Sequence, residues 1–136
     1  MFLIERSIEV GYRLRVRFTE NVFDPANRVL QKILCDDERG SLPKVLVVLD
    51  ESLAQAQPTL ARLITAYFTA HGSVVTLACP PLVIEGGERT KNSFFHVSEI
   101  QSQIDRYHID RHSYVIAVGG GALLDMAGLA DRKSVV

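Results

Sequence analysis

The chain opens with apolar and polar residues that alternate between positions 8 and 18. The apolar positions share one parity: Ile8, Val10, Tyr12, Leu14, Val16 and Phe18. This period of two predicts a strand, or two strands bent at Gly11, with one buried face. Arg13, Arg15 and Arg17 occupy the other face. They could meet a phosphate, but a solvated strand face is the interpretation that we favour.

Asp24 and Pro25 are typical of the start of a helix. An aspartate can accept hydrogen bonds from the free N–H groups of a helix N-terminus, and proline fits the first helical position. An apolar stripe at helical spacing follows at Val29, Leu30, Ile33 and Leu34. The sequence therefore predicts a helix that begins at Asp24.

Three apolar runs predict strands that are buried on both faces, as in a parallel sheet. They cover residues 44–50, 74–79 and 114–118. Pro80 and Pro81 end the second run, and a short extended piece is expected at 82–84.

Two segments between these runs carry apolar residues at helical spacing. In segment 58–71 the core stripe comprises Leu60, Leu63, Ile64, Tyr67 and Phe68. Gly72 is a natural stop for this helix. In segment 92–108 the stripe comprises Val97, Ile100, Ile104 and Tyr107. A last helix is expected to start near Ala122.

Strands that alternate with helices indicate right-handed βαβ crossovers, and hence an α/β fold with a Rossmann-like, mostly parallel sheet. The length of 136 residues supports one domain. In such sheets ligands bind beyond the carboxyl ends of the strands. Three places meet this rule: Asp50, the loop 85–91 and the glycine triplet 119–121.

The composition restricts the possible partners. The chain has 15 Lys+Arg against 16 Asp+Glu, so a general electrostatic attraction to nucleic acid or to an anionic membrane is not expected. No apolar run approaches the roughly 20 residues that span a bilayer, and the N-terminus lacks a signal-peptide pattern. The cysteines and histidines show neither CxxC nor HExxH spacing, which argues against a disulfide scaffold and a zinc finger. We therefore expect a soluble, cytoplasmic protein.

The glycine triplet lies between a predicted strand and a predicted helix. Glycines let backbone N–H groups approach a phosphate, which the positive end of a helix also attracts. The GxGxxG motif is absent, because Leu124 stands where its third glycine would be. Packing is the alternative reason for such a turn. Asp125, on the first helical turn, either complements the helix dipole or accepts a hydrogen bond from a ligand hydroxyl.

Asp50 and the loop 85–91 carry the other polar candidates. An acidic residue at the end of a buried strand often binds ribose hydroxyls, although it can equally cap the following turn. Glu88 and Lys91 are three residues apart. That spacing suits a surface ion pair or the orientation of a polar ligand. Three such places at one edge of a sheet indicate a site more strongly than each does alone.

The loop and the glycine turn together resemble a known family. Residues 85–91, Glu-Gly-Gly-Glu-Arg-Thr-Lys, fit a GExxK loop, and residues 119–128 fit a GGGxxxDxxG turn. In this order they resemble the N-terminal domain of 3-dehydroquinate synthase and related sugar phosphate cyclases, over about residues 10 to 130. The segments that look most like the synthase-like branch of bacterial Ebo gene clusters are 15–19, 23–27 and 110–114.

The resemblance implies that this domain binds NAD. By match to the family's motifs, the residues that would contact it are Asp50, Glu88, Lys91, Gly120, Gly121 and Asp125. Asp50 would hold the adenosine ribose, and the loop residues would line the cofactor. The glycine turn and its aspartate would take the pyrophosphate and neighbouring groups.

The resemblance also implies the reaction of a full-length parent. A hydroxyl of a sugar phosphate is oxidised with NAD, phosphate is eliminated, the hydride returns, and an intramolecular aldol addition closes a carbocycle. A divalent metal, zinc or cobalt, is expected in a C-terminal helical domain of that parent. The parent is expected to be a homodimer. No metal ligand or catalytic residue is assigned within this chain, and we expect the chain alone to be inactive.

The chain departs from the family's pattern after Gly128. We therefore divide it into an incomplete NAD-binding domain, residues 1–130, and a tail, residues 131–136, for which we hypothesise a non-native origin. The codons GAT CGG AAG AGC GTC GTG would encode this tail and match the start of a common sequencing adapter. The source DNA tests this hypothesis.

Two other functions stay open on the sequence. Iron-type alcohol or glycerol dehydrogenases share the GGGxxxD turn, but they usually carry a lysine three residues after the aspartate, where this chain has Gly128. A non-catalytic nucleotide-binding module is the second alternative. NAD affinity in a monomer would favour that module.

Overall fold

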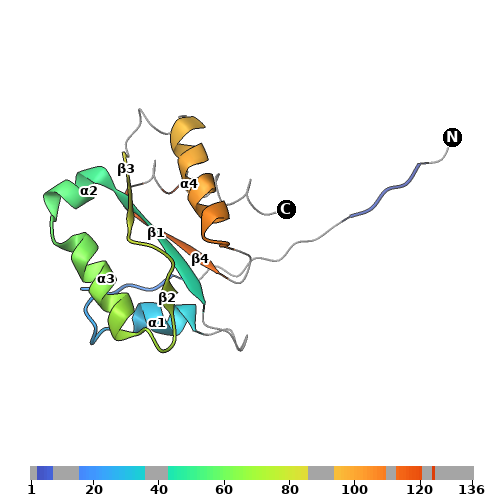
Figure 1. The fold of residues 1–136 in the computed structure, drawn as a ribbon. Helices are drawn as coiled ribbons and strands as arrows, with labels where there is room; N and C mark the ends of the chain where they lie inside the picture. The colour runs from blue at the N-terminus through green and yellow to red at the C-terminus, as the bar shows by residue number, and fades with distance from the viewer. Residues whose placement is uncertain are drawn as a thin grey trace.

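A computed structural model of the chain describes residues 3–7, 16–35, 43–85, 94–109, 113–120 and 124. Within these ranges a parallel sheet lies between two layers of helices (Figure 1). The helices are α1 (Val29–Leu34), α2 (Glu51–Ala56), α3 (Leu60–Ala70) and α4 (Phe94–Arg106). The strands are β1 (Lys44–Asp50), β2 (Thr76–Leu77), β3 (Leu82–Ile84) and β4 (Tyr114–Val118). The prediction of an α/β fold with a parallel sheet is confirmed.

Strand β1 is the centre of the described sheet. β4 pairs with it without interruption, from Val45 opposite Tyr114 to Leu49 opposite Val118. β2 and β3 pair with the beginning and the end of β1, respectively. A strand has two edges and β4 occupies one of them. β2 and β3 therefore share the other edge, one after the other.

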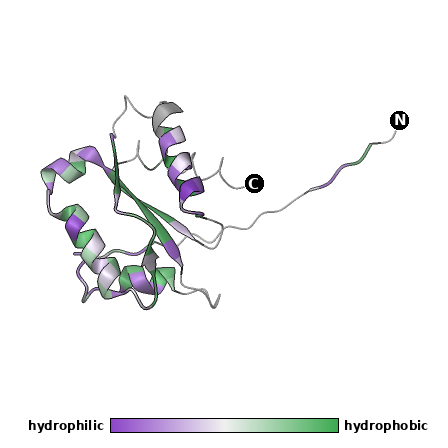
Figure 2. Ribbon diagram, in the orientation of Figure 1, coloured by the Kyte–Doolittle hydropathy of each residue, from purple (hydrophilic) through white to green (hydrophobic). Residues whose placement is uncertain are grey.

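Helices cover both faces of β1. Its odd-numbered residues face a core that includes side chains of α1 and α3, and its even-numbered residues face a core built with α4. The five apolar residues from Val45 to Leu49 are 0% exposed. Figure 2 shows the central strands in green, between helices that are green only in part. The prediction of a strand buried on both faces is confirmed for 44–50.

The two other predicted buried strands are corrected in part. β4 has the predicted bounds, but each of its residues is only half-buried. Among the described strands it pairs with β1 alone, so it has one edge without a described strand. The predicted strand 74–79 is reduced to β2, and Thr76 is exposed. Both corrections have the same cause, since an apolar run does not reveal whether a strand lies at the centre of a sheet or at its edge. The extended piece 82–84 is confirmed as β3.

The predicted strand 8–18 is not observed in its described part, residues 16–18. Positions 8–15 lie outside the described residues. Residues 16–19 form no strand, and Val16 and Phe18 are 60% and 96% exposed. The prediction of a buried face is therefore wrong for this end of the segment. Alternation shows that one face is apolar, but burial also needs a surface that covers it, and no described strand pairs with residues 16–19.

Asp24 caps a turn rather than the predicted helix. Its Oδ1 accepts a hydrogen bond from the N–H of Ala26 at 2.9 Å. Helix α1 begins only at Val29, whose N–H donates to Oδ1 of Asn27 at 3.0 Å. Nδ2 of Asn27 also donates to the carbonyl oxygen of Glu20 at 2.8 Å. The predicted start at Asp24 is wrong because these local side-chain bonds hold the backbone in turns before the helix.

Helices α3 and α4 confirm the predicted stripes with exceptions at their margins. Leu60, Ile64, Tyr67 and Phe68 of α3 are at most 8% exposed, but Leu63 is 50% exposed. Leu63 lies at one margin of the stripe, where contact with the sheet ends. In α4, the stripe residues Val97, Ile100 and Ile104 are buried and Tyr107 is half-buried.

Candidate functional site

The winding of the sheet reverses between β1 and β4. From β1 the chain passes through α2 and α3 to β2 and β3 on one edge, and then through α4 to β4 on the other edge. The two crossovers use opposite faces of the sheet. In open parallel sheets, ligands bind in the crevice beyond the carboxyl ends of the two strands at such a reversal. The candidate site therefore lies beyond the ends of β1 and β4.

The register brings three strand ends to the same level at this point. Leu49 pairs with Val118, so the next residues, Asp50 and Gly119, lie beside each other where these two strands end. Asp50 also pairs with Ile84, after which the loop that starts at Glu85 begins. The expectation that the three candidate segments start at one edge of the sheet is confirmed.

Asp50 is held by the helix that follows it. It is the N-cap of α2, with φ −64° and ψ 128°, and its Oδ1 accepts the N–H of Ser52 at 2.9 Å. The capping role that the sequence left open is therefore confirmed. The apolar pattern did not predict α2, because six residues with Leu53 as their one large apolar side chain show no periodicity. From the described residues, the other carboxylate oxygen of Asp50 receives no hydrogen bond.

Gly120 lies in an open turn. A Cβ atom placed on it would meet no atom of the described residues within 4 Å, so packing against these residues does not require glycine at this position. Its carbonyl oxygen accepts the N–H of Leu124 at 3.1 Å, which is the hydrogen-bond pattern of a first helical turn. Leu124 is helical, but the expected start of the helix near Ala122 lies outside the described residues. Gly120 is thus an exposed residue that makes this bond to a helical residue.

The other predicted contacts lie outside the described residues. They are Glu88, Lys91, Gly121 and Asp125. Their roles stay predictions.

A cavity of about 570 Å³ opens beside the end of β4. Its walls are mostly apolar and include Leu53 of α2, Leu60 of α3 and Val118 of β4. The segment 21–25 forms one side, and Gln57 adds a polar group. This cavity was not predicted, because it joins three segments that are distant in sequence, 21–25, 53–63 and Val118.

Tyr67 of α3 ties the segment before α1 to the body of the domain. Its hydroxyl donates to the carbonyl oxygen of Asn27 at 3.2 Å and accepts the N–H of Gln31 at 3.1 Å. The ring is 0% exposed and meets Phe23 edge-on, with centroids 6.0 Å apart. Burial raises the pKa of Tyr67, although the bond from Gln31 lowers it in part. A tyrosine in an apolar stripe is the signal for such a bond, since a buried hydroxyl needs partners.

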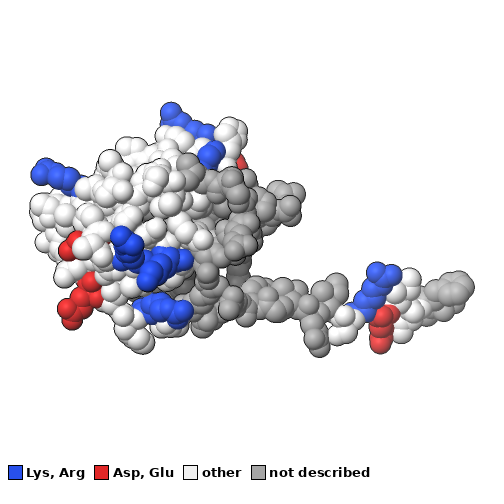
Figure 3. Space-filling view, turned by 90° about the horizontal axis from the view of Figure 1, so that it is seen from below, with Lys and Arg blue, Asp and Glu red and all other residues white. Residues whose placement is uncertain are grey.

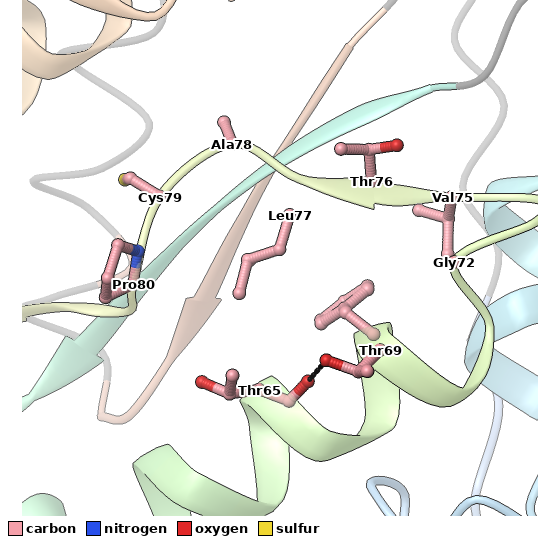
Figure 4. A pocket seen from close by; sticks show the side chains of 10 residues that line it. Thr65, Thr69, Gly72, Val75, Thr76, Leu77, Ala78, Cys79 and Pro80 are labelled. Atoms are coloured by element: carbon pink, nitrogen blue, oxygen red, sulfur yellow. Dashed lines mark hydrogen bonds between the residues drawn. The ribbon is translucent and has the colours of Figure 1, made fainter.

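A second groove, of about 480 Å³, runs between α3 and β2 (Figure 4). Thr65 and Thr69 line it from the helix, and residues 75–80 line it from the strand side. Both hydroxyls donate to helix carbonyl oxygens, including Thr69 Oγ1 to the Thr65 carbonyl at 2.9 Å. Because these hydroxyls already have partners, the groove offers few free polar groups.

Cationic side chains gather away from the candidate site. Seen from below, the surface on the side of α1 carries several lysine and arginine side chains close together (Figure 3). Lys32 of α1 and Arg28, the N-cap of this helix, are both exposed. The carboxyl end of β1 leads instead into α2 (Figure 1). This surface therefore takes no part in the site proposed below.

Two further kinds of feature are absent from the described ranges. No three His, Cys, Asp or Glu side chains among those residues are grouped so that they could hold a metal ion. None of the helices described is long and apolar enough to cross a membrane.

Sequence comparison finds similarity over segments that follow the strand ends. Residues 81–133, which include the loop and the glycine turn, match the family 3-dehydroquinate synthase N-terminal. Over these residues the chain is similar in sequence to the N-terminal region of 3-dehydroquinate synthases. The 3-dehydroquinate synthase of Pelobacter propionicus is 32% identical over 68% of this chain. That of Helicobacter pylori strain HPAG1 is 33% identical over 68% of the chain, and the 2-epi-5-epi-valiolone synthase of an Actinomyces species is 30% identical over 85%. The family expected from the motifs is thus supported, whereas the Ebo branch stays a prediction.

The chain spans about a quarter of the length of these curated relatives. The matched part is 24% of the Pelobacter protein, 26% of the Helicobacter protein and 28% of the Actinomyces protein. No solved structure matches the chain significantly.

Proposed function

We propose that this chain forms the NAD-binding part of a 3-dehydroquinate synthase-like sugar phosphate cyclase, in the branch found in Ebo gene clusters. The observation that carries the proposal is the meeting of a carboxylate and a glycine turn where the winding of the sheet reverses. Asp50 and Gly120 are its described members. Homology to the N-terminal region of 3-dehydroquinate synthases supports the same assignment.

The carboxylate of Asp50 suits the hydroxyls of a ribose. Its bond to Ser52 fixes the orientation of the side chain. The second oxygen can then accept a ribose hydroxyl without loss of the capping bond, and hydrogen bonds to a charged acceptor are the stronger kind. Asp50 is half-buried, so the ribose can reach it from solvent.

The turn at Gly120 suits the pyrophosphate. The space that the described residues leave open at Gly120 allows a phosphate to approach the backbone, and a helix that begins at this turn would add a positive dipole end. We place Gly121 and Asp125 on the same turn, and Glu88 and Lys91 on the facing loop. When bound, NAD would accept a hydride from the substrate and return it later.

In a full-length parent we propose the complete cyclase reaction on a sugar phosphate. It comprises oxidation of a hydroxyl, elimination of phosphate, re-reduction and an intramolecular aldol closure. A divalent metal, zinc or cobalt, would be held by a further domain of a homodimeric parent. We propose that the present chain binds NAD and is catalytically inactive by itself.

Calorimetric titration of NAD into the chain and two matched variants tests the proposal. Asp50→Asn keeps an oxygen for Ser52 but removes the charge that the ribose would meet. Asp24→Asn is the control, because Asp24 makes the same kind of bond, to Ala26 at 2.9 Å, and does not belong to any of the three segments that follow the strand ends. A hydrogen bond to a charged group contributes about 1.5–3 kcal/mol, so we expect Asp50→Asn to weaken NAD binding roughly 10-fold or more. Asp24→Asn should bind as the parent chain does.

Two results would contradict the proposal. One is a folded parent chain that does not bind NAD. The other is an equal loss of affinity in both variants.

A further inference from the structure

The outer edge of the sheet contains a two-residue bulge. Leu77 of β2 pairs with Val45, and Leu82 of β3 pairs with Val48. Two residues of β1 separate Val45 from Val48, but four residues, 78–81, separate Leu77 from Leu82. The outer strand therefore carries two extra residues at this point, and the ladder is interrupted between β2 and β3.

The two prolines explain the interruption. The N–H groups of Thr76 and Ala78 donate inward, to the carbonyl oxygens of Pro43 at 3.0 Å and Val45 at 2.8 Å. Successive residues of a strand direct their N–H groups to opposite edges, so residue 80 would be the next inward donor after Ala78, and residue 81 would be the next outward donor after Cys79. Both are prolines, which have no N–H. One proline stops pairing with β1, and the other removes a donor from the outer edge.

The edge would otherwise be open to another strand. No described strand pairs with β2 or β3 on the side away from β1. Thr76 is exposed and Val83 is 45% exposed. An unpaired and regular edge of apolar residues is a template for edge-to-edge association, and natural sheets interrupt such edges with prolines and bulges.

We propose that the bulge at Ala78–Pro81 prevents this edge from pairing with the same edge of a second copy of the chain. Without Pro80 and Pro81, Ala78 and Cys79 would stand opposite Leu46 and Val47. Leu82 to Ile84 would keep their present partners. The outward N–H groups of Leu77, Cys79 and Val83 would then follow one another at every second residue, as strand addition requires.

Deletion of Pro80 and Pro81 tests the proposal. We expect this variant to unfold cooperatively and to self-associate reversibly, so that its sedimentation coefficient rises with protein concentration under reducing conditions. The sedimentation coefficient of the parent chain should not show this rise. Hydrogen exchange at Leu77, Cys79 and Val83 should be fast in the parent chain and should slow in the associated variant. Adding Val83→Lys to the deletion should restore the parent's sedimentation, because a lysine blocks an edge.

Each other outcome would overturn the proposal. A deletion variant that sediments as the parent chain does would show that the bulge does not prevent association. Association without protection of those three amides, or unaffected by Val83→Lys, would place the contact on another surface. Loss of cooperative unfolding would show that Leu82 to Ile84 do not keep their partners. Slow exchange at Leu77 and Val83 in the dilute parent chain would mean that the edge is already covered.

Discussion

Replacing Gly120 with alanine separates a ligand-binding role of the glycine turn from a packing role. A methyl group at this position meets no atom of the described residues within 4 Å, and the backbone of Gly120 does not have the positive φ that favours glycine. The fold should therefore accept the change. The methyl group would instead occupy the space through which we expect a phosphate to approach the backbone.

The two effects of this substitution have opposite signs. Alanine in a compatible conformation restricts the unfolded chain, so the free energy of unfolding should stay the same or rise by about 0.4–1 kcal/mol. Loss of one backbone hydrogen bond to a charged phosphate costs about 1.5–3 kcal/mol. This loss corresponds to a decrease in NAD affinity of roughly 10- to 100-fold.

Titration calorimetry with NAD and urea unfolding of the same preparation measure both effects. Gly72→Ala is the control with the reverse expectation, because its Cβ would lie 3.2 Å from the carbonyl oxygen of Thr69, at the end of α3. Such crowding forces the Thr69 carbonyl to shift by a few tenths of an ångström, so we expect no gain in stability and no change in NAD affinity. If Gly120→Ala bound NAD like the parent chain, or if it unfolded more readily, our account of the turn would be wrong.

Two further predictions concern stability. Tyr67→Phe should lower the free energy of unfolding by about 1–3 kcal/mol, because it removes the hydroxyl that joins Asn27 and Gln31. Burial raises the pKa of Tyr67 above its ordinary value of 10.0. The contribution of the hydroxyl to stability is therefore complete below pH 10 and is lost as the pH rises through the folded-state pKa. Urea unfolding across that range should show a smaller decline in the free energy of unfolding for Tyr67→Phe than for the parent chain. Ile64→Ala should lower the free energy of unfolding by about 2–5 kcal/mol and Leu63→Ala by much less, because Ile64 is 0% exposed and Leu63 is 50% exposed. If thermal unfolding showed similar losses for both variants, Leu63 would not lie at the margin of the buried stripe.

Local sequence determined which segments form strands and helices in the core. The run 44–50 is apolar at every interior position, and a strand of that composition is stable only between two covered faces. The spacing of Leu60, Ile64, Tyr67 and Phe68 likewise determined which face of α3 is buried. The chemical candidates were also visible, because glycines and carboxylates after buried strands are local features. The motifs at 85–91 and 119–128 indicated the family for the same reason.

The tertiary structure alone decided what these elements meet. The period-two pattern predicts a strand with a buried face at 8–18, but Phe18 is 96% exposed. Alternation along the chain does not provide the surface that would cover this face. Hydrogen bonds of the Asn27 side chain move the start of α1 to Val29. Asp50 caps α2, a helix whose sequence has no apolar period. Only the pairing of Leu49 with Val118 brought Asp50 beside the glycine turn. Register and strand order depend on contacts between residues that are distant in sequence, whereas a pattern along the chain records each segment's own preference.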